Sequence, residues 1–232
     1  MRINPGLVYN IVMSSLTLKI IAVVTMLVDH VGFLFFPEEQ IFRIIGRISF
    51  PLFAFLIAEG FIKTKDVKEY LKRLSIFAVI SQVPFFFFER VAGLSGIHLN
   101  ILFTLALGVL TLLVITKVRN LPIKILGVLA LLTLAYFGNF SYGVYGVLSI
   151  LGSYLFLKNR KAGIVPLSVL PFLENIRLFL MNIIFLQFFA VFSLIPIYFY
   201  NGNQGPKISR LFFYWFYPVH MAVLTLIFIA IK

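Results

Sequence analysis

Long runs of apolar residues, separated by short polar and basic segments, extend along the whole chain. Runs that reach or approach the roughly 20 residues needed to cross a bilayer predict helices. They lie at residues 15–36, 44–62, 71–88, 99–116, 121–138, 142–157, 178–200 and 211–231. A shorter run at 162–173 carries Pro166 and Pro171 and is either a kinked ninth span or a re-entrant element. Because the runs are continuous and do not alternate with polar residues, they argue against a β-barrel. The pattern predicts an all-α, polytopic transmembrane helical bundle of eight or nine helices.

Basic residues concentrate in alternate connections between the predicted helices. They are Lys63, Lys65, Lys68, Lys72, Arg73, Lys117, Arg119, Lys124, Lys158, Arg160 and Lys161. The intervening connections carry acidic residues with few cations, namely Glu38, Glu39, Glu89 and Glu174. Because basic loops remain in the cytoplasm, this pattern places the N-terminus inside, with Lys19 at the cytoplasmic end of the first helix. A spanning 162–173 segment brings Lys207 inside as well, so the charge pattern favours nine helices.

The composition excludes an ordinary soluble domain, with 61% hydrophobic residues, 12% charged residues and a mean hydropathy of +1.05. We expect a single integral-membrane domain over residues 1–232. The net charge of +12 is spread thinly between apolar segments. This distribution is typical of charges that set membrane topology and contact anionic lipid, and it argues against a nucleic-acid-binding surface. The chain has no cysteine, so disulfides, thiolate metal sites and cysteine acyl intermediates are excluded, and we expect no metal site. The start, MRINPGLVYN, does not resemble a cleavable signal peptide. We therefore expect a multi-pass protein of the inner (plasma) membrane, in contact with the lipid bilayer, either monomeric or a homo-oligomer.

Lys19 and His30 are the first candidates for a functional site. They share one apolar segment with ten residues between them, which places them on one helix face about 16 Å apart along the axis. Ionisable groups within a membrane are costly and by default mark functional sites. Lys19 at the membrane edge would hold the phosphates of a long cofactor such as coenzyme A, whose reactive end reaches His30. The alternative is that Lys19 is a topology anchor and His30 a hydrogen-bonded interior histidine.

Asp29 precedes His30, but neighbouring helical residues diverge by about 100°. Asp29 is therefore expected to pair with Arg43 or Arg47, which lie one turn apart in the next apolar segment. The pair is either purely structural or part of a site in which the arginines also bind an anionic group. His30 is the candidate general base, because imidazole accepts protons near neutral pH.

Polar residues at the start of the fourth predicted helix lie on the same side as His30. Asn100 is a candidate catalytic residue there, as a donor to an oxyanion, and Thr104 follows one turn later. His98 is either a solvated interfacial histidine or a participant in the site. In the last helix, His220 follows Pro218. A structural role in satisfying backbone groups freed by the proline is favoured for His220.

Two features belong to the predicted cytoplasmic side. Glu59 lies one turn before Lys63, which favours a structural ion pair. The turn-rich loop 201–207, with sequence NGNQGPK, ends at Lys207. Its backbone amides could cradle a nucleotide phosphate, so Lys207 is a candidate cofactor contact.

Six stretches, in order from the first helix to the last, resemble the TraX family of polytopic bacterial membrane proteins. They are LKIIAVVTMLVDHVG (18–32), FRIIGRISFPLFAFLIAEGF (42–61), KEYLKRLSIFAVISQVPF (68–85), LNILFTLALG (99–108), YGVYGVLSILGSYLF (142–156) and YNGNQG…FFYWFYPVH (200–220). The resemblance implies N-terminal acetylation of conjugative pilin with acetyl-CoA. The spacing from Lys19 to His30 also resembles the Arg-then-His pattern of the membrane acyltransferase family three. That second resemblance implies that His30 is the base and that Lys19 contacts the acyl donor.

The leading interpretation is a membrane-embedded acetyltransferase that uses cytoplasmic acetyl-CoA. Its acyl acceptor would be an amine or hydroxyl, on a pilin-like peptide N-terminus or a surface glycan. One alternative is a transporter or lipid-handling protein in which Asp29 and His30 form a proton relay. Another is a noncatalytic membrane chaperone for pilin or a secretion complex.

Overall fold

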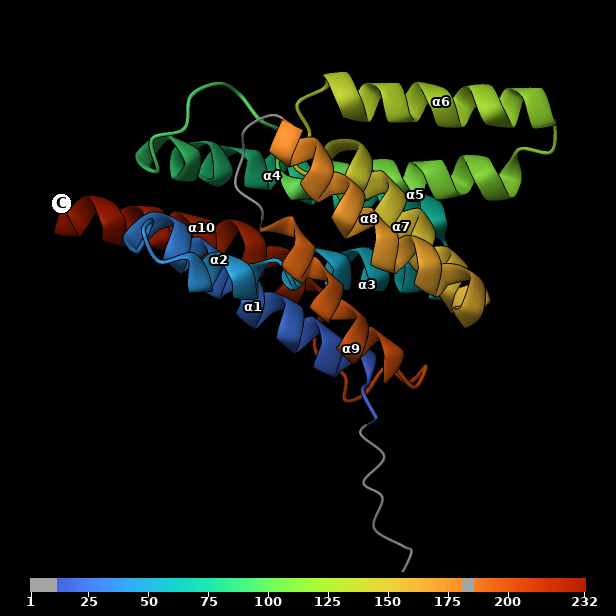
Figure 1. Ribbon diagram of the computed structural model, residues 1–232, viewed down its shortest axis with the longest axis horizontal. Coiled ribbons are helices and arrows are strands. Elements are labelled where there is room, and N and C mark those ends of the chain that lie inside the picture. The colour runs from blue at the N-terminus through green and yellow to red at the C-terminus, as the bar shows by residue number, and fades with distance from the viewer. Residues whose placement is uncertain (1–11, 181–185) are drawn as a thin grey trace, which may run out of the picture.

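The computed structural model describes residues 12–180 and 186–232. These residues form α-helices and one 3-10 helix joined by short connections (Figure 1). The elements are α1 (Ser15–Phe35), α2 (Gln40–Gly46), α3 (Ser49–Lys63), α4 (Val67–Val91), α5 (Ile101–Lys117), α6 (Leu121–Phe137), α7 (Gly143–Lys158), α8 (Arg160–Leu180), the 3-10 helix η1 (Gln187–Ser193), α9 (Leu194–Tyr198) and α10 (Arg210–Ile231). The prediction of an all-α bundle is confirmed.

Five segments are long and apolar enough to cross a membrane: α1, α2 with α3, α4, α8 and α10. Four shorter apolar segments accompany them in the described ranges: α5, α6, α7, and η1 with α9. A helix of 17 residues, such as α5 or α6, is about 25 Å long, which nearly matches a hydrocarbon core of about 30 Å. The chain is therefore a helical membrane protein, and these segments agree with the higher of the two predicted helix numbers.

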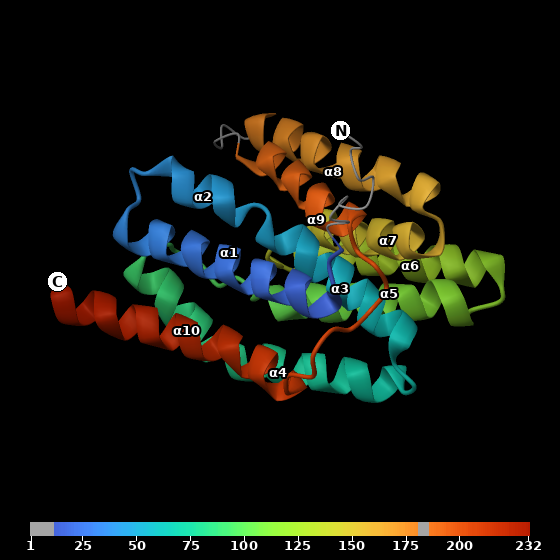
Figure 2. The same cartoon turned by 90° about the horizontal axis from the view of Figure 1, so that it is seen from below.

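The direction of the first and last helices supports the same number. Phe35 of α1 contacts Phe228 of α10, and His30 contacts His220, with ring centroids 5.7 and 5.0 Å apart. The contact nearer the C-terminal end of α1 is also the one nearer the C-terminal end of α10. The two helices are therefore parallel, and Figure 2 shows them side by side. Parallel first and last helices are expected for nine consecutive spans, whereas the first and eighth would be antiparallel.

Two predicted segments were wrong in their extent. The short run 162–173 is the middle of the 21-residue helix α8, which contains both Pro166 and Pro171. The predicted helix 178–200 does not exist as one element, because 178–180 end α8 and the chain resumes as η1 and α9. Residues 181–185 of that prediction lie outside the described residues. Apolar character continues through this region, so hydropathy does not reveal where one helix ends and the next begins.

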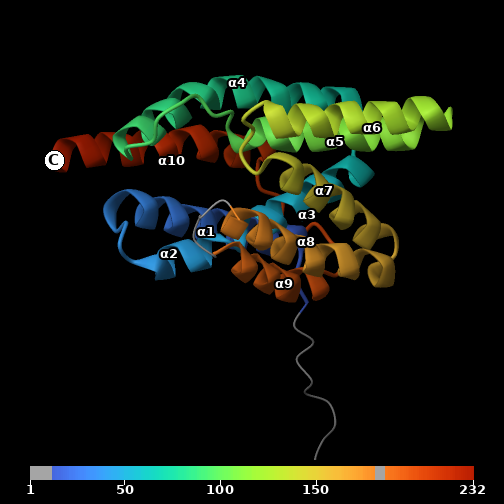
Figure 3. The same cartoon turned by 45° about the horizontal axis from the view of Figure 1, so that its top comes forward.

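The helices form three layers (Figure 3). On one side lie α4, α5, α6 and α10, on the other α1, α2, α8 and α9, with α3 and α7 between them. The main buried core joins side chains from α1, α3, α4, α5, α7 and α10, among them Met26, Phe50, Phe88, Leu105 and Tyr217. Helix α1 is thereby held between α2, α3 and α10.

Two local features bring the site together. The chain at 98–100 pairs with 139–141, where the Leu99 amide donates to the Asn139 carbonyl at 2.9 Å and the Ser141 amide donates to the Leu99 carbonyl at 2.9 Å. Tyr142 follows in a left-handed conformation with φ of 63°, which turns the chain sharply into α7. On the other side, a Cβ at Gly32 would lie 2.0 Å from Phe42, so glycine is what allows α1 and α2 to approach.

Candidate active site

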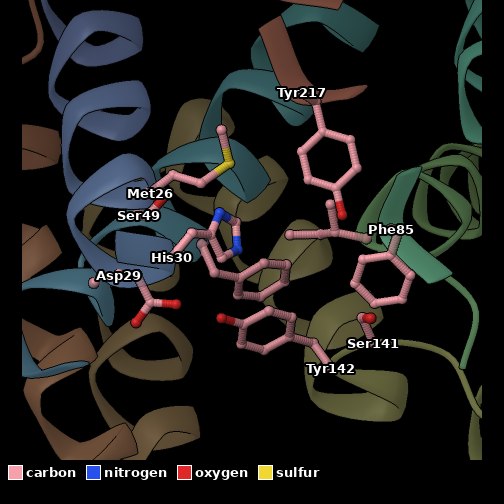
Figure 4. A pocket seen from close by; sticks show the side chains of 11 residues that line it. Met26, Asp29, His30, Ser49, Phe85, Ser141, Tyr142 and Tyr217 are labelled. Atoms are coloured by element: carbon pink, nitrogen blue, oxygen red, sulfur yellow. The ribbon is translucent and has the colours of Figure 1, made fainter. Parts of the chain in front are cut away.

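A cavity of about 80 Å³ lies among α1, α3, α4, α10 and the turn before α7 (Figure 4). The residues with polar side chains in its lining are Asp29, His30, Ser49, Ser141, Tyr142 and Tyr217. The rest of the wall is mostly apolar and aromatic. A cavity of this size holds a few waters or a small acyl group, but not a whole nucleotide cofactor.

His30 reaches the cavity from α1 and contacts a second histidine. Its Nδ1 lies 2.8 Å from His220 Nε2, and His220 Nδ1 lies 2.7 Å from the Phe216 carbonyl. The Phe88 ring packs edge-on against the His30 ring at 5.3 Å. His220 is buried, and its ring on α10 and the Phe88 ring on α4 both pack against the imidazole of His30.

Asp29 is bound by two arginines. Arg43 Nη1 donates to its Oδ2 at 2.7 Å, and Arg47 Nη2 donates to its Oδ1 at 3.0 Å. Gly46 makes room for the carboxylate, because a Cβ there would lie 2.1 Å from Asp29 Oδ1. The expected ion pair is thus present with both cations. Two guanidinium groups against one carboxylate leave one excess positive charge beside the cavity.

Arg47 is anchored further by groups that were not predicted from the sequence. Arg47 Nη1 donates to Gln187 Oε1 at 3.4 Å, and Gln187 Nε2 donates to the Tyr145 hydroxyl at 3.1 Å. Gln187 is buried at the start of η1, in a region predicted as a plain apolar helix. A glutamine within an apolar run was the sequence signal that could have identified Gln187 as a site residue.

Tyr142 was also missed. Its ring stacks on Phe50 with centroids 3.9 Å apart and planes 9° from parallel. Its hydroxyl points to the side of the cavity where Asp29 lies (Figure 4). A tyrosine in a glycine-rich turn carries no sequence signal for this placement, because the left-handed backbone at 142 determines it.

Asn100 is placed by the structure as a helix cap, against its predicted catalytic role. Its Oδ1 accepts from the Leu102 amide at 3.0 Å, and its Nδ2 donates to the Ala78 carbonyl at 2.7 Å and to Gln82 Oε1 at 2.9 Å. Both side-chain protons are used, the side chain is fully buried, and it does not line the cavity. This geometry leaves Asn100 no donor for an oxyanion, so we assign it to capping α5.

Two neighbours predicted on the same side also serve the scaffold. Thr104 donates to the Ser141 carbonyl and so ties α5 to the turn before α7. His98 Nδ1 lies 3.0 Å from Glu89 Oε1, and His98 does not line the cavity.

Lys19 lies on the same face of α1 as His30, as expected, because both side chains contact α10. Lys19 Nζ lies 5.4 Å from the centre of the Phe213 ring, and His30 contacts His220. The cavity does not extend to Lys19. The structure therefore aligns the two predicted residues along the seam between α1 and α10 but does not join them in one pocket.

The loop 201–207 lies at the N-terminal end of α1. Its carbonyls at Asn203 and Gln204 accept the Ser15 and Leu16 amides at 2.8 and 3.1 Å. The Gly202 carbonyl accepts from Lys63 Nζ at 2.7 Å. The loop thus presents acceptors to the helices, which does not support the predicted phosphate cradle. Lys207 is exposed at this end.

Glu59 forms a second buried cluster near this loop, as the predicted ion pair with Lys63. Lys63 Nζ donates to Glu59 Oε1 at 2.7 Å, and the hydroxyls of Ser15 and Tyr200 also donate to this oxygen. Burial and the neighbouring Glu59 carboxylate raise the pKa of Tyr200. The cluster fastens α1, α3 and the segment before α10 together.

An apolar groove of about 580 Å³ runs along the outer side of the seam between α4 and α10. Its lining includes Pro84 and Pro218, whereas the adjacent Phe85 and Tyr217 line the His30 cavity. The same two helices therefore separate the cavity from the groove.

The fold and this site define a helical membrane protein that holds ionisable residues around a small internal cavity. The family model described as TraX protein matches residues 14–228, and the chain belongs to the TraX family. It is 32% identical over 236 residues to the "Probable fimbrial assembly protein FimC, serogroup H1" of Dichelobacter nodosus, covering 93% of this chain and 96% of that protein. It is 34% identical over 91 residues to the "Uncharacterized protein RP591" of Rickettsia prowazekii (strain Madrid E), covering 39% of this chain and 33% of that protein. No solved structure matches the chain.

Proposed function

We propose that this protein is a membrane-embedded acetyltransferase that moves an acetyl group from acetyl-CoA to an amine or hydroxyl, with His30 as the general base. The observation that carries the proposal is the imidazole of His30 at a small, partly polar cavity inside the bundle. A half-buried base beside a space of acyl size suits a transfer reaction from which bulk water is largely excluded.

The proposed reaction needs no acyl-enzyme. His30 Nε2 takes the proton of the acceptor as its nitrogen or oxygen attacks the thioester carbonyl. The tetrahedral intermediate collapses, the carbon–sulfur bond breaks, and the proton passes from His30 to the sulfur of coenzyme A. The products are the acetylated acceptor and free coenzyme A, and direct transfer agrees with the absence of cysteine.

The excess positive charge beside the cavity supports an oxyanion. Asp29 neutralises one of the guanidinium charges of Arg43 and Arg47, and the other remains as a fixed charge near the cavity. Preorganised positive charge in a water-poor site stabilises developing negative charge without reorganisation. In this proposal Asp29 positions the arginines and does not touch the reacting atoms.

The donor would lie along the seam between α1 and α10. The acetyl group occupies the cavity at His30, and the phosphates lie toward Lys19, about 16 Å away along α1. Lys207 is exposed near the same end of α1 and is a secondary candidate for phosphate contact. This arrangement assigns that end to the cytoplasm, which agrees with the basic loops and with an inner (plasma) membrane location.

For the acceptor, the relative named as a fimbrial assembly protein favours a pilin-type peptide amine over a glycan hydroxyl. That relative covers nearly the whole chain. We propose the N-terminal amine of a pilin-like subunit as the acceptor and a surface glycan as the second candidate.

The test is acetyl transfer from radiolabelled acetyl-CoA in membranes that contain the wild type, His30→Gln, Lys19→Ala or Lys161→Ala. Peptide, lipid and polysaccharide fractions are counted, and release of coenzyme A is followed in parallel. We expect label in the peptide fraction, a loss of about 10²-fold or more in His30→Gln, and a raised KM for acetyl-CoA in Lys19→Ala. Lys161, a basic residue on α8, serves as the matched control.

Absence of both acetyl-CoA binding and coenzyme A release, with native acceptors present, would reject the enzyme and favour the transporter. Full activity in His30→Gln would reject His30 as the base. Label in the polysaccharide fraction would keep the enzyme and change the acceptor.

A further inference from the structure

The hydrogen bonds of His220 determine where its proton lies. The Phe216 carbonyl can only accept, so His220 Nδ1, at 2.7 Å, must carry the proton that joins them. In a neutral imidazole the other nitrogen, Nε2, is then an acceptor. His220 is buried on α10 and its ring stacks on Phe216, with centroids 4.9 Å apart and planes 17° from parallel, so the ring is held in this orientation.

This assignment fixes the tautomer of His30 in turn. His30 Nδ1 lies 2.8 Å from His220 Nε2, and because that nitrogen accepts, His30 Nδ1 must donate. The neutral His30 ring then has its lone pair on Nε2, the nitrogen that the proposed reaction needs. The proton positions along Phe216, His220 and His30 therefore follow from one backbone carbonyl.

Asp29 does not supply this orientation. Its Oδ2 and Oδ1 accept from Arg43 and Arg47, while His30 Nδ1 lies against His220 Nε2. General bases are commonly oriented by a third group that fixes the tautomer and supports the imidazolium. In this protein the group in contact with His30 is a second histidine.

We propose that His220 is the positioning residue of the transfer reaction: it holds His30 in the Nδ1–H tautomer and stabilises the His30 imidazolium. The role rests on the proposed function. As the acceptor loses its proton to His30 Nε2, the bond from Nδ1 to His220 Nε2 becomes a charge-assisted hydrogen bond. When coenzyme A leaves, the proton passes from His30 Nε2 to the sulfur of coenzyme A, and both histidines are neutral again.

The proton positions are tested without any substrate. The chain has three histidines, so ¹⁵N-histidine labelling of the purified full-length protein, with His98→Gln and His220→Gln for assignment, gives few signals. We expect His30 and His220 both to carry their protons on Nδ1 in the wild type. In His220→Leu the constraint is absent, and the His30 proton is expected to appear on Nε2. A wild-type His30 protonated on Nε2 would overturn the proposal.

The kinetic role is tested with three variants. His220→Leu removes the acceptor, and we expect kcat to fall by about 10²-fold, as for a base held in the wrong tautomer, with little change in KM. His220→Gln can present an amide oxygen to His30 Nδ1, so it should recover at least 10-fold of that loss. His98→Gln is the control, because His98 pairs with Glu89 and does not line the cavity.

The outcomes separate the two proposals. If the wild type transfers no acetyl group, the proposed function fails, while the ¹⁵N spectra still decide the proton positions. If transfer occurs and His220→Leu keeps the wild-type kcat and His30 tautomer, the positioning role is rejected. If His220→Gln and His220→Leu are equally impaired although both fold, the acceptor at 220 is not what His30 requires, and the role is again rejected.

Discussion

Removal of the Asp29 carboxylate tests the physical core of the site. Asp29→Ala leaves Arg43 and Arg47 facing each other without their shared anion. The exposed fractions of the side chains are 12% for Asp29, 14% for Arg47 and 27% for Arg43. Two largely buried cations therefore lose their partner at once.

The magnitude follows from this burial. At an effective dielectric constant of 20, two unit charges about 4 Å apart interact with about 4 kcal/mol. Part of this attraction offsets the desolvation of the groups. Breaking a buried pair by removing one partner typically destabilises a protein by about 3–5 kcal/mol. Because Arg43 is more than a quarter exposed, we expect the lower end of that range, about 3 kcal/mol.

The assay is thermal unfolding of purified protein in detergent, followed by intrinsic fluorescence. For a chain of this length, about 3 kcal/mol corresponds to a fall in Tm of about 6–12 °C. The control is Glu69→Ala, which removes an exposed pair with Arg73 at 3.5 Å, worth under about 0.5 kcal/mol. The double variant Asp29→Ala/Arg47→Met should recover at least half of the lost Tm, because it removes one of the two cations that Asp29→Ala leaves without its carboxylate partner.

An Asp29→Ala protein whose Tm matches that of Glu69→Ala would contradict this account of the buried charges. The arginines would then be solvated well enough to need no partner. A double variant less stable than Asp29→Ala would also contradict it, since removal of an unpaired charge should help.

Three further predictions concern the scaffold. Gly46→Ala puts a Cβ 2.1 Å from Asp29 Oδ1, so it should lower Tm by a similar amount to Asp29→Ala. Gly152→Ala is the control, because its Cβ would meet its nearest neighbour at 3.4 Å, and its Tm should be nearly unchanged. If the Tm losses of Gly46→Ala and Asp29→Ala add in the double variant, displacement of the Asp29 carboxylate is not their shared cause. Asn100→Ala removes the cap of α5 and should cost about 0.5–2 kcal/mol in thermal unfolding while kcat per folded molecule stays within twofold; a selective loss of kcat would restore its catalytic role. Glu59→Gln weakens the cluster that holds the segment before α10, so limited proteolysis should cut that segment faster than in the wild type, and unchanged cleavage would show that the cluster does not hold it.

Several features of the site followed from the sequence. The cost of an unpaired carboxylate in a membrane predicts a cation for Asp29, and only Arg43 and Arg47 stand near the next turn. The spacing of Lys19 and His30 predicts one shared face, and both contact α10. These predictions use helix periodicity and the energetics of buried charge, which need no knowledge of the remaining chain.

The role of Asn100 could not be predicted from the sequence. A polar residue at the start of an apolar helix is compatible with a cap or with a catalytic donor. The choice depends on whether its amide protons meet protein acceptors, and here they meet the Ala78 carbonyl and Gln82. Both partners come from α4, about 20 residues earlier in the chain, and no local pattern specifies that contact.

The amino-acid sequence alone is enough to identify this chain as a helical membrane protein, because apolar runs of this length must satisfy their backbone groups within helices. It also determined the family and the candidate residues on α1. The contact of His30 with His220, 190 residues away, at a cavity that Tyr142 lines, arises from the packing of the folded chain. Apolar runs are interchangeable in composition, so which helix faces which depends on close packing at residues such as Gly32 and Gly46 and on the left-handed turn at Tyr142. Those contacts join distant parts of the chain, and they place the two imidazoles within hydrogen-bond distance.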